Sequence, residues 1–468
     1  MKQLATTDAS FINLETNNCP QHVGSLGIYD PSTAEGGFVR FKDVINNFEQ
    51  RLNNLPLFRT RLVQVPGGLD KPYWVVDANF DVEFHLRHIA LPQPGDWRQL
   101  CIQIARLHSR PLDMSRPLWE AYIIEGLDNI EGLPKGSFAM YTKMHHSLVD
   151  GAGGQAYLAS FHDLEPNPKP AEVDHAPIFA EHQPSPPELL TRAALNNLKD
   201  VAKLTVNGAG LAKNMLKFGL DIAQKKKTPP DISAPKTRFN EKVGVHRVFD
   251  SAIFTLEEFK AVKTGLGVTI NDVALATVSG ALRRYLTDKN QLPEDSLAAA
   301  IPLNMRTRKG ENNDNNQVGS TFCDLHTNVE DPIERVGKLH ESANKAKEFS
   351  EGSPFIDAIK IAGVLNPVIT RPVVKFWQNN HLSKYLPVNL STVVTNVPGP
   401  NFDIYCAGAK LVRLHGLGLL QPGCGLFHAV FSSGNSLTIS FLGDRKQMPD
   451  PGFYAECLQA SFEELKAA

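Results

Sequence analysis

The chain has 468 residues, of which 42% are hydrophobic and 21% are charged, and its formal net charge is −2 at pH 7. This length predicts two or three globular domains, each large enough to bury a core of its own. The nearly balanced charge argues against a nucleic-acid binder, which would normally carry an excess of basic residues.

The first 165 residues alternate short β-prone runs with amphipathic helices. Residues 43–55 carry apolar side chains at helical spacing, which predicts a helix. Residues 73–76 and 121–124 are predicted to be strands, and so is the apolar run at 137–144. Residues 151–164 then have the pattern of a helix with a glycine-rich start.

The heptapeptide His-His-Ser-Leu-Val-Asp-Gly at residues 145–151 lies between that last strand and that helix. A side chain at such a junction can be held rigidly at the mouth of a cleft. An alcohol is a poor nucleophile near neutral pH, and a neutral imidazole, with an ordinary pKa of roughly 6.5, is well matched to accept its proton. The motif therefore indicates a site that deprotonates a hydroxyl group.

Three other interpretations of this motif stay open at this point. The two histidines can be ordinary core or surface residues, and Asp150 can orient the loop without touching a substrate. A zinc site is the third, because His and Asp are normal ligands. It is disfavoured, since neighbouring histidines project in different directions and no Glu stands between them as in a metalloprotease helix. We therefore expect no metal.

A proline-rich connector follows at residues 166–187, and residues 188–227 are predicted to form one long helix or a helix pair. This stretch is rich in Leu, Ala and Lys, and it ends in three lysines before Pro229. The favoured interpretation is a packed crossover helix with a solvated basic face. The alternative is a surface that lies on a membrane, because basic amphipathic helices are attracted to anionic headgroups.

The second half begins near residue 238 with a predicted strand at 242–249, and further strands are predicted at 297–303, 391–396 and 436–442. Helical patterns, including one at 273–286, separate them. Alternating helices and strands in both halves predict two α/β domains, at 1–165 and 238–468, joined by the connector and crossover helix at 166–237. The apolar residues 355–377 are expected to pack in the core, or to line part of a pocket for a long apolar chain, where each buried methylene contributes about 0.8 kcal/mol.

A family resemblance runs through these motifs in order. The His-His-x-x-x-Asp-Gly motif resembles that of acyltransferases related to chloramphenicol acetyltransferase and condensation domains. Further blocks narrow the resemblance to the bacterial wax ester synthase/diacylglycerol acyltransferases. These blocks are Asp-Ala-Ser-Phe at 8–11, His-Val-Gly at 22–24, Pro-Leu-Asp at 111–113, Arg-Pro-Leu-Trp at 116–119, Thr-Ile-Asn-Asp-Val at 269–273 and Asn-Val-Pro-Gly-Pro at 396–400. Together they span almost the whole chain.

The resemblance implies two chloramphenicol-acetyltransferase-like α/β domains with an active-site tunnel between them. It implies that His146 is the general base and that His145 supports the site. Asp150 is expected to be a structural brace paired with Arg306, because the matching acid of the superfamily forms an ion pair with an arginine. Gly151 would allow the chain to turn sharply into the following helix.

Several further residues are expected near the substrate. The resemblance makes Asn271 a candidate donor to the oxyanion, although Asn271 or Asp272 can equally be the N-cap of the following helix. Pro398-Gly399 is the usual pair of a type II turn, with glycine at positive φ, and the resemblance places it beside the tunnel. Trp119 is expected to be a buried aromatic residue, with a role in the acyl pocket as the alternative.

The sequence contains no candidate for an acylated nucleophile. The six cysteines have no neighbouring His and form no Cys-x-x-Cys pair, so we expect free thiols in a reducing compartment. No Gly-x-Ser-x-Gly elbow is present, and the lack of a phosphate-binding loop argues against nucleotide-driven chemistry. The start lacks the apolar stretch of a signal peptide, and no window approaches the ~18 apolar residues of a spanning helix. A cytoplasmic protein, at most peripheral to the inner membrane or lipid droplets, is expected.

The function that the resemblance implies is direct transfer of a long-chain fatty acyl group from acyl-CoA to fatty alcohols, giving wax esters, and to diacylglycerol, giving triacylglycerol. Acyl-CoA is then a co-substrate, and no cofactor and no nucleic-acid partner are expected. One alternative is a condensation-type acyltransferase that uses another donor or acceptor. The other is a non-catalytic protein that binds the surface of lipid droplets.

Overall fold

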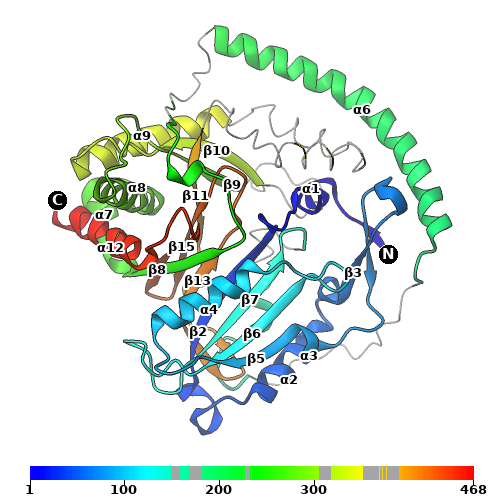
Figure 1. Ribbon diagram of the computed structural model, residues 1–468, viewed down its shortest axis with the longest axis horizontal. Coiled ribbons are helices and arrows are strands. Elements are labelled where there is room, and N and C mark those ends of the chain that lie inside the picture. The colour runs from blue at the N-terminus through cyan, green and yellow to red at the C-terminus, as the bar shows by residue number, and fades with distance from the viewer. Residues whose placement is uncertain are drawn as a thin grey trace.

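Two six-stranded sheets with helices packed on them dominate the part of the chain that the structure describes, and they confirm the predicted α/β class (Figure 1). The computed structural model describes residues 1–148, 159–168, 182–224, 226, 232, 234–304, 318–350, 368, 372, 376 and 389–468. A third, three-stranded sheet has the order β1-β4-β3, and its strands are β1 (Lys2–Gln3), β3 (Thr60–Val63) and β4 (Tyr73–Val76).

The first sheet has the strand order β12-β13-β2-β7-β6-β5. Its strands are β2 (His22–Asp30), β5 (Leu86–Ala90), β6 (Trp119–Glu125), β7 (Phe138–His145), β12 (Tyr405–Cys406) and β13 (Ala409–Leu417). The helices of this half are α1 (Thr6–Leu14), α2 (Phe41–Leu52), α3 (Val82–His85) and α4 (Trp97–Ser109). The structure confirms the strands predicted at 73–76, 121–124 and 137–144 and the helix predicted at 43–55, with bounds that agree within three residues.

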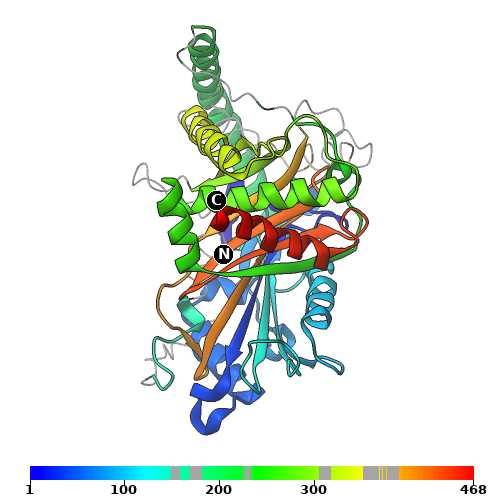
Figure 2. The ribbon, with the colours of Figure 1, turned by 90° about the vertical axis from the view of Figure 1, so that its left-hand side faces the viewer.

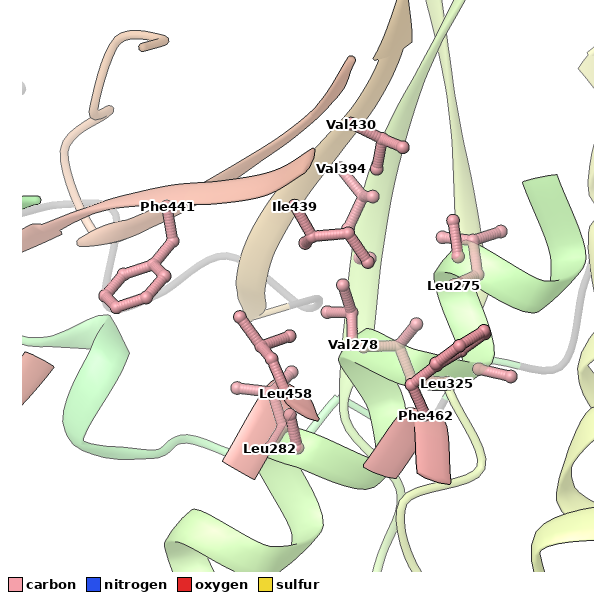
Figure 3. Packing of buried hydrophobic residues seen from close by; sticks show 14 of the residues in the cluster. Leu275, Val278, Leu282, Leu325, Val394, Val430, Ile439, Phe441, Leu458 and Phe462 are labelled. Carbon is pink, nitrogen blue, oxygen red and sulfur yellow. The ribbon is translucent and has the colours of Figure 1, made fainter. Parts of the chain in front are cut away.

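The second sheet has the order β10-β9-β11-β14-β15-β8. Its strands are β8 (Arg247–Thr255), β9 (Ala298–Asn304), β10 (Val318–Asp324), β11 (Leu390–Val397), β14 (Leu426–Ser433) and β15 (Ser436–Asp444). The helices that accompany it are α7 (Leu256–Leu266), α8 (Ile270–Asp288), α9 (Pro332–Ser350) and α12 (Pro451–Ala467). Figure 3 shows its core, in which Leu282 of α8 and Leu458 and Phe462 of α12 face the sheet residues Val430 and Ile439.

The strand predicted at 242–249 begins later than expected, at Arg247. The backbone N–H of Gly244 donates instead to the Asp444 carboxylate (2.7 Å), and the Arg247 guanidinium donates to the Gly244 carbonyl (2.7 Å). These side-chain contacts hold residues 241–246 as a loop, because they occupy backbone groups that a ladder would otherwise pair.

Strand β13 joins the two sheets. It lies in the second half of the sequence but pairs with β2 of the first sheet, with Leu414 opposite Gly27. Its backbone also meets the second sheet, because the hydroxyl of Thr438 donates to the Leu414 carbonyl (2.6 Å) and that of Ser440 to the Gly416 carbonyl (2.8 Å). The domain limits predicted at 165 and 238 stay predictions, but the C-terminal range contributes this strand to the first sheet.

The predicted crossover helix is α6 (Pro186–Ala223), a single helix of 38 residues at the edge of the molecule (Figures 1 and 2). Near its N-terminus Leu189 and Ala193 are buried against Tyr73 and Val75 of the three-stranded sheet. Within the described ranges, no single helix is long and apolar enough to cross a membrane; α7 and α8 meet that criterion only as a pair bent by 97°.

Candidate active site

The His145-His146 pair lies at the end of β7, as predicted, and its backbone is held from two sides. The N–H of His145 donates to the Leu118 carbonyl (2.9 Å), just before β6, and the N–H of His146 donates to the Gln21 carbonyl (2.8 Å), just before β2. A turn follows, in which the Leu148 N–H donates to the His145 carbonyl (2.9 Å). The β-ladder thus fixes both histidines relative to the two neighbouring strands.

The imidazole of His145 is fully buried and bonded at both nitrogens. Its Nδ1 lies 2.7 Å from the Ser147 hydroxyl and accepts from the Ser147 backbone N–H (3.1 Å), while its Nε2 lies 2.6 Å from the Glu15 carboxylate. Because Nδ1 accepts a backbone N–H, the proton is assigned to Nε2, which donates to Glu15. Both nitrogens are thus engaged within the protein, and the supporting role of His145 stays a prediction.

The imidazole of His146 is half-buried and stacks on the Phe11 ring, with ring centroids 4.1 Å apart and planes inclined by 16°. The pKa of His146 is lowered from 6.5 to about 4. Burial is the main cause, and the neighbouring His145 contributes a smaller part. The ring is therefore neutral at neutral pH and can accept a proton, which is the state that a general base requires.

Helix α1 contributes two residues that had no assigned role in the sequence. Phe11 covers the face of His146, and Glu15, directly after the helix, binds His145. Their separation from the motif is about 130 residues, and no sequence pattern connects them to it. The pairing of β2 with β7, which sets His22 opposite His145, brings the two segments together. In the sequence, only the family resemblance of Asp-Ala-Ser-Phe at 8–11 indicated that this segment belongs to the site.

A second pair of histidines, His22 on β2 and His108 on α4, connects these two elements. His22 Nε2 lies 2.7 Å from the His108 carbonyl, and His108 itself contacts the Tyr141 hydroxyl (2.7 Å) and the Gly418 carbonyl (3.0 Å). Since carbonyls only accept, Nε2 carries the proton in both rings, and Tyr141 donates to His108. Burial keeps the pKa of His22 well below 6.5 and that of His108 at about 3, so both rings are neutral.

The end of α4 is fixed by a buried lysine on β7. The ammonium of Lys143 donates to the carbonyls of Leu107 (3.2 Å) and Arg110 (2.9 Å), and it lies 3.2 Å from the Glu120 carboxylate. Burial lowers the pKa of Lys143, and Glu120 opposes that shift. A cation at a helix C-terminus is favourable, so the strand that carries the histidines is anchored to α4.

The cap predicted for α8 is corrected by the structure. Its N-cap is Thr269, rather than Asn271 or Asp272, because Asp272 is the third helical residue and closes a capping box with Thr269. The Asp272 carboxylate accepts from the Thr269 backbone and hydroxyl (2.9 and 2.7 Å) and lies 2.7 Å from His340 Nδ1. Asn271, half-buried at the second position of α8, stays a predicted oxyanion donor.

The type II turn predicted at Gly399 is also wrong. Gly399 does not have the positive φ of a type II turn; instead, a Cβ at this position would overlap the backbone oxygen of Ser432. Glycine is required because β14 approaches this closely, and the Gly399 N–H lies 3.3 Å from the Ser432 hydroxyl. The substrate-binding role of Pro398 and Gly399 stays a prediction.

Trp119 is a core residue, as expected by default. It is 1% exposed, its indole N–H donates to the Phe58 carbonyl (2.8 Å), and its ring stacks against His85. Asp150, Gly151 and Arg306 lie outside the described residues, and so does the apolar segment 355–377 apart from residues 368, 372 and 376. In the part of the chain that the structure describes, no three His, Cys, Asp or Glu side chains gather as metal ligands would.

Comparisons with known proteins agree over the whole chain. A family model described as the wax ester synthase/diacylglycerol acyltransferase catalytic domain matches residues 4–274, and one described as the WS/DGAT C-terminal domain matches residues 315–466. A putative diacylglycerol O-acyltransferase of Mycobacterium tuberculosis is 31% identical over 467 residues, which cover 99% of both chains.

Solved structures extend the comparison to the fold. The wax ester synthase/diacylglycerol acyltransferase from Marinobacter aquaeolei VT8 is 26% identical, with a TM-score of 0.69 and coverage of 100% of this chain and 99% of that one. A trichothecene 15-O-acetyltransferase from Fusarium sporotrichioides shares the fold at 13% identity, with a TM-score of 0.58 and coverage of 99% and 94%.

Proposed function

The chain belongs to the wax ester synthase/diacylglycerol acyltransferase family and is an acyltransferase, and from this premise we propose that it moves a long-chain fatty acyl group from coenzyme A to fatty alcohols and diacylglycerol. The observation that carries the proposal is the neutral, half-buried imidazole of His146. The nitrogens of the neighbouring His145 are already bonded to Ser147 and Glu15. We therefore assign the general base to His146 and the supporting role to His145.

In the proposed reaction, His146 takes the proton of the acceptor hydroxyl as its oxygen attacks the thioester carbonyl. A carbon–oxygen bond forms, and the carbonyl oxygen becomes an oxyanion, for which Asn271 is the proposed donor. The tetrahedral intermediate then collapses, the carbon–sulfur bond breaks, and the coenzyme A thiolate takes the proton from the His146 imidazolium. The products are an ester and free coenzyme A.

The acyl group passes directly between the two substrates in this scheme. The six cysteines are all buried, and burial raises the pKa of Cys19 and Cys457 to about 11 and that of Cys323, Cys406 and Cys424 to about 12. A thiol in this state is a poor nucleophile. No resident cofactor is required. Asp150 is proposed to brace the loop after the histidines by pairing with Arg306.

The acceptors are water-insoluble, so we propose that the enzyme works at the surface of the inner membrane or of lipid droplets. The single imidazole base recognises only a hydroxyl, and apolar pockets distinguish acceptors weakly, by about 1–3 kcal/mol per methylene. One site should therefore accept both a fatty alcohol and diacylglycerol.

The experiment measures release of coenzyme A and transfer of labelled acyl groups from acyl-CoA to hexadecanol, to dioleoylglycerol and to mixtures of both. The wild type should esterify both, with competition between them. His146→Ala should lose both activities by about 100- to 10,000-fold while its melting temperature is unchanged. His246→Ala, at an exposed histidine away from the motif, is the matched control and should keep full activity.

Three outcomes would contradict the proposal. Additive rates at saturating concentrations of both acceptors would mean separate sites. Loss of one activity alone in His146→Ala would exclude a shared base. Wild-type protein that binds lipid but releases no coenzyme A would indicate a lipid-binding protein without this activity.

A further inference from the structure

The long helix α6 presents polar residues to the body of the protein. Asn196 donates to the Asp70 carboxylate (2.8 Å), Asn197 donates to the Leu69 carbonyl (3.0 Å), and Asp200 lies 3.6 Å from the ammonium of Lys71. A surface helix of a globular protein normally buries its apolar stripe and exposes its polar side. In this part of α6 much of the inward face is polar.

Four leucines of α6 have exposed side chains on the side away from the body. Leu195 and Leu198 are 55% and 71% exposed, and Leu216 and Leu220, near the other end, are 69% and 50% exposed. Leu198 and Leu216 are 18 residues apart, about five turns, so they lie on one line along the helix. At ~1.5 Å per residue this line extends about 27 Å between the two. Leu195 and Leu220 lie within one turn of its ends.

Lysines border this line of leucines. Lys199, Lys213 and Lys217 are exposed, and Lys199 and Lys217 follow Leu198 and Leu216 directly, so they repeat at the same interval of 18 residues. Three acidic residues belong to α6. Glu188, near its N-terminus, pairs with Arg192 (3.1 Å). Asp200 contacts Lys71 on the inner face, and Asp221 is three residues from Phe218, which is buried near Phe349. The exposed leucines thus have a positively charged margin.

We propose that this face of α6 is the lipid-binding surface of the protein. The helix lies flat on an anionic bilayer or droplet monolayer, with Leu195, Leu198, Leu216 and Leu220 inserted among the acyl chains. Lys199, Lys213 and Lys217 contact the lipid phosphates. Such binding scales with buried apolar area and with attraction between basic residues and anionic headgroups.

The charge pattern favours lipid over a second copy of this chain. Two copies that packed α6 against α6 would bring their lysine margins together, and like charges at an interface are unfavourable. An anionic lipid surface offers the opposite charge. The helix is also distinct from a membrane span, since within the described residues no single helix meets the criteria for one.

The surface would bring the enzyme to its insoluble acceptor, and in that sense it rests on the proposed function. Its test does not depend on turnover. Vesicle binding is measured without acyl-CoA, so a failure of lipid binding and a failure of the proposed reaction are distinguishable.

The first experiment tests the leucines by co-sedimentation with vesicles of phosphatidylglycerol and phosphatidylcholine. The double variant Leu198→Gln/Leu216→Gln should lower the partition coefficient at least about tenfold, because glutamine keeps helix propensity but removes apolar area. The matched control Phe38→Gln/Leu164→Gln removes two apolar side chains that are 53% and 70% exposed elsewhere, and it should bind as the wild type does. Circular dichroism should show unchanged helix content in both.

The second experiment tests the lysines. Lys199→Gln/Lys213→Gln/Lys217→Gln should weaken binding by about fivefold per lysine, the equivalent of ~1 kcal/mol each, and the effect should shrink at high salt. The control Lys42→Gln/Lys260→Gln/Lys345→Gln makes the same change in net charge at exposed lysines off α6 and should have little effect. Vesicles of phosphatidylcholine alone should bind the wild type more weakly.

Two results would overturn the proposal. Equal vesicle binding by the leucine variant and its control would exclude α6 as the lipid surface. A wild-type dimer in sedimentation equilibrium that becomes monomeric only in the leucine variant, with vesicle binding unchanged, would assign the face to a second copy of the chain.

Discussion

Phe11 is the residue that controls the environment of the proposed base. It lies nearly parallel to the His146 ring at 4.1 Å and covers one face of it. Burial is the largest cause of the lowered pKa of His146, so we expect the phenylalanine to influence the pH range of the proposed reaction.

Removing this cover should shift the acidic limb of the pH–rate profile. A general base loses activity as pH falls through its pKa, so kcat/KM of the wild type should fall below pH of about 4. In Phe11→Ala, water should reach the His146 ring. The midpoint of the acidic limb should then move to higher pH, toward the ordinary histidine pKa of roughly 6.5. Phe11→Leu keeps an apolar cover and is the control, with a limb near that of the wild type. The measurement is kcat/KM between pH 4 and 8; identical profiles for the alanine variant and the wild type would contradict the role of Phe11.

At the scale of elements, α1 and the residue after it contact both histidines at the end of β7. The helix places Phe11 on His146 and ends at Glu15, which accepts from His145 at 2.6 Å. His145 in turn bonds Ser147 in the turn that follows. A displacement of about 1 Å at a catalytic group can cost on the order of 100-fold in rate, so we expect an element that fixes this turn to influence the proposed reaction.

Removing the carboxylate should therefore affect kcat more than KM. Glu15→Ala leaves the buried Nε2–H of His145 without its acceptor, and we expect kcat to fall by about 10- to 100-fold with little change in KM. Glu15→Gln retains an oxygen that can accept the same hydrogen bond and should restore most of the activity. Steady-state kinetics on both variants test this. An alanine variant with wild-type kcat, or with a change in KM alone, would refute the positioning role.

At the scale of the whole molecule, neutral histidines are buried in both halves. Burial lowers the pKa of His108 in the first half and of His428 in the second to about 3. His415 on β13 also has a pKa of about 3, and among the described residues neither of its ring nitrogens has a hydrogen-bond partner. Its ring packs beside those of Trp97 and Phe249, with centroid distances of 5.3 and 6.3 Å.

Acid should destabilise the fold through these groups. Each binds a proton in the unfolded chain below roughly pH 6.5 but not in the folded chain until about pH 3, so stability is complete above pH 6.5 and is lost as pH falls. Each contributes up to about 1.4 kcal/mol per pH unit in that window. His415→Leu should reduce this slope by about that amount and should stabilise the protein at neutral pH, because it removes two unsatisfied polar atoms. Urea unfolding at pH 7, 6 and 5 measures it. The same substitution at exposed His246 should leave the slope unchanged, and an unaltered slope in His415→Leu would refute the assignment.

Much of the architecture could be predicted from the sequence, because local periodicity reports which face of an element is buried. The helix predicted at 43–55 has apolar residues at helical spacing, whereas the strands at 73–76, 121–124 and 137–144 are short, continuous β-prone runs. The histidine motif and the family could also be predicted from the sequence, since both depend on residue types at fixed spacing. The wrong predictions are local. The strand predicted at 242–249 begins only at Arg247, because side chains such as Asp444 bind the backbone before it. Gly399 is required by a close backbone approach and not by a turn.

Contacts between distant segments were decided only by the tertiary structure. Nothing in residues 8–15 predicts that Phe11 and Glu15 meet a motif about 130 residues later, or that β13 returns to pair with β2. The exposure of the four leucines on α6 was also decided by the tertiary structure. The sequence shows the amphipathic pattern of the helix but not which face the body covers. The sequence by itself determined the elements, the family and the proposed base. The tertiary structure determined the surroundings of that base, because its pKa and orientation depend on burial and hydrogen bonds that long-range strand pairing creates.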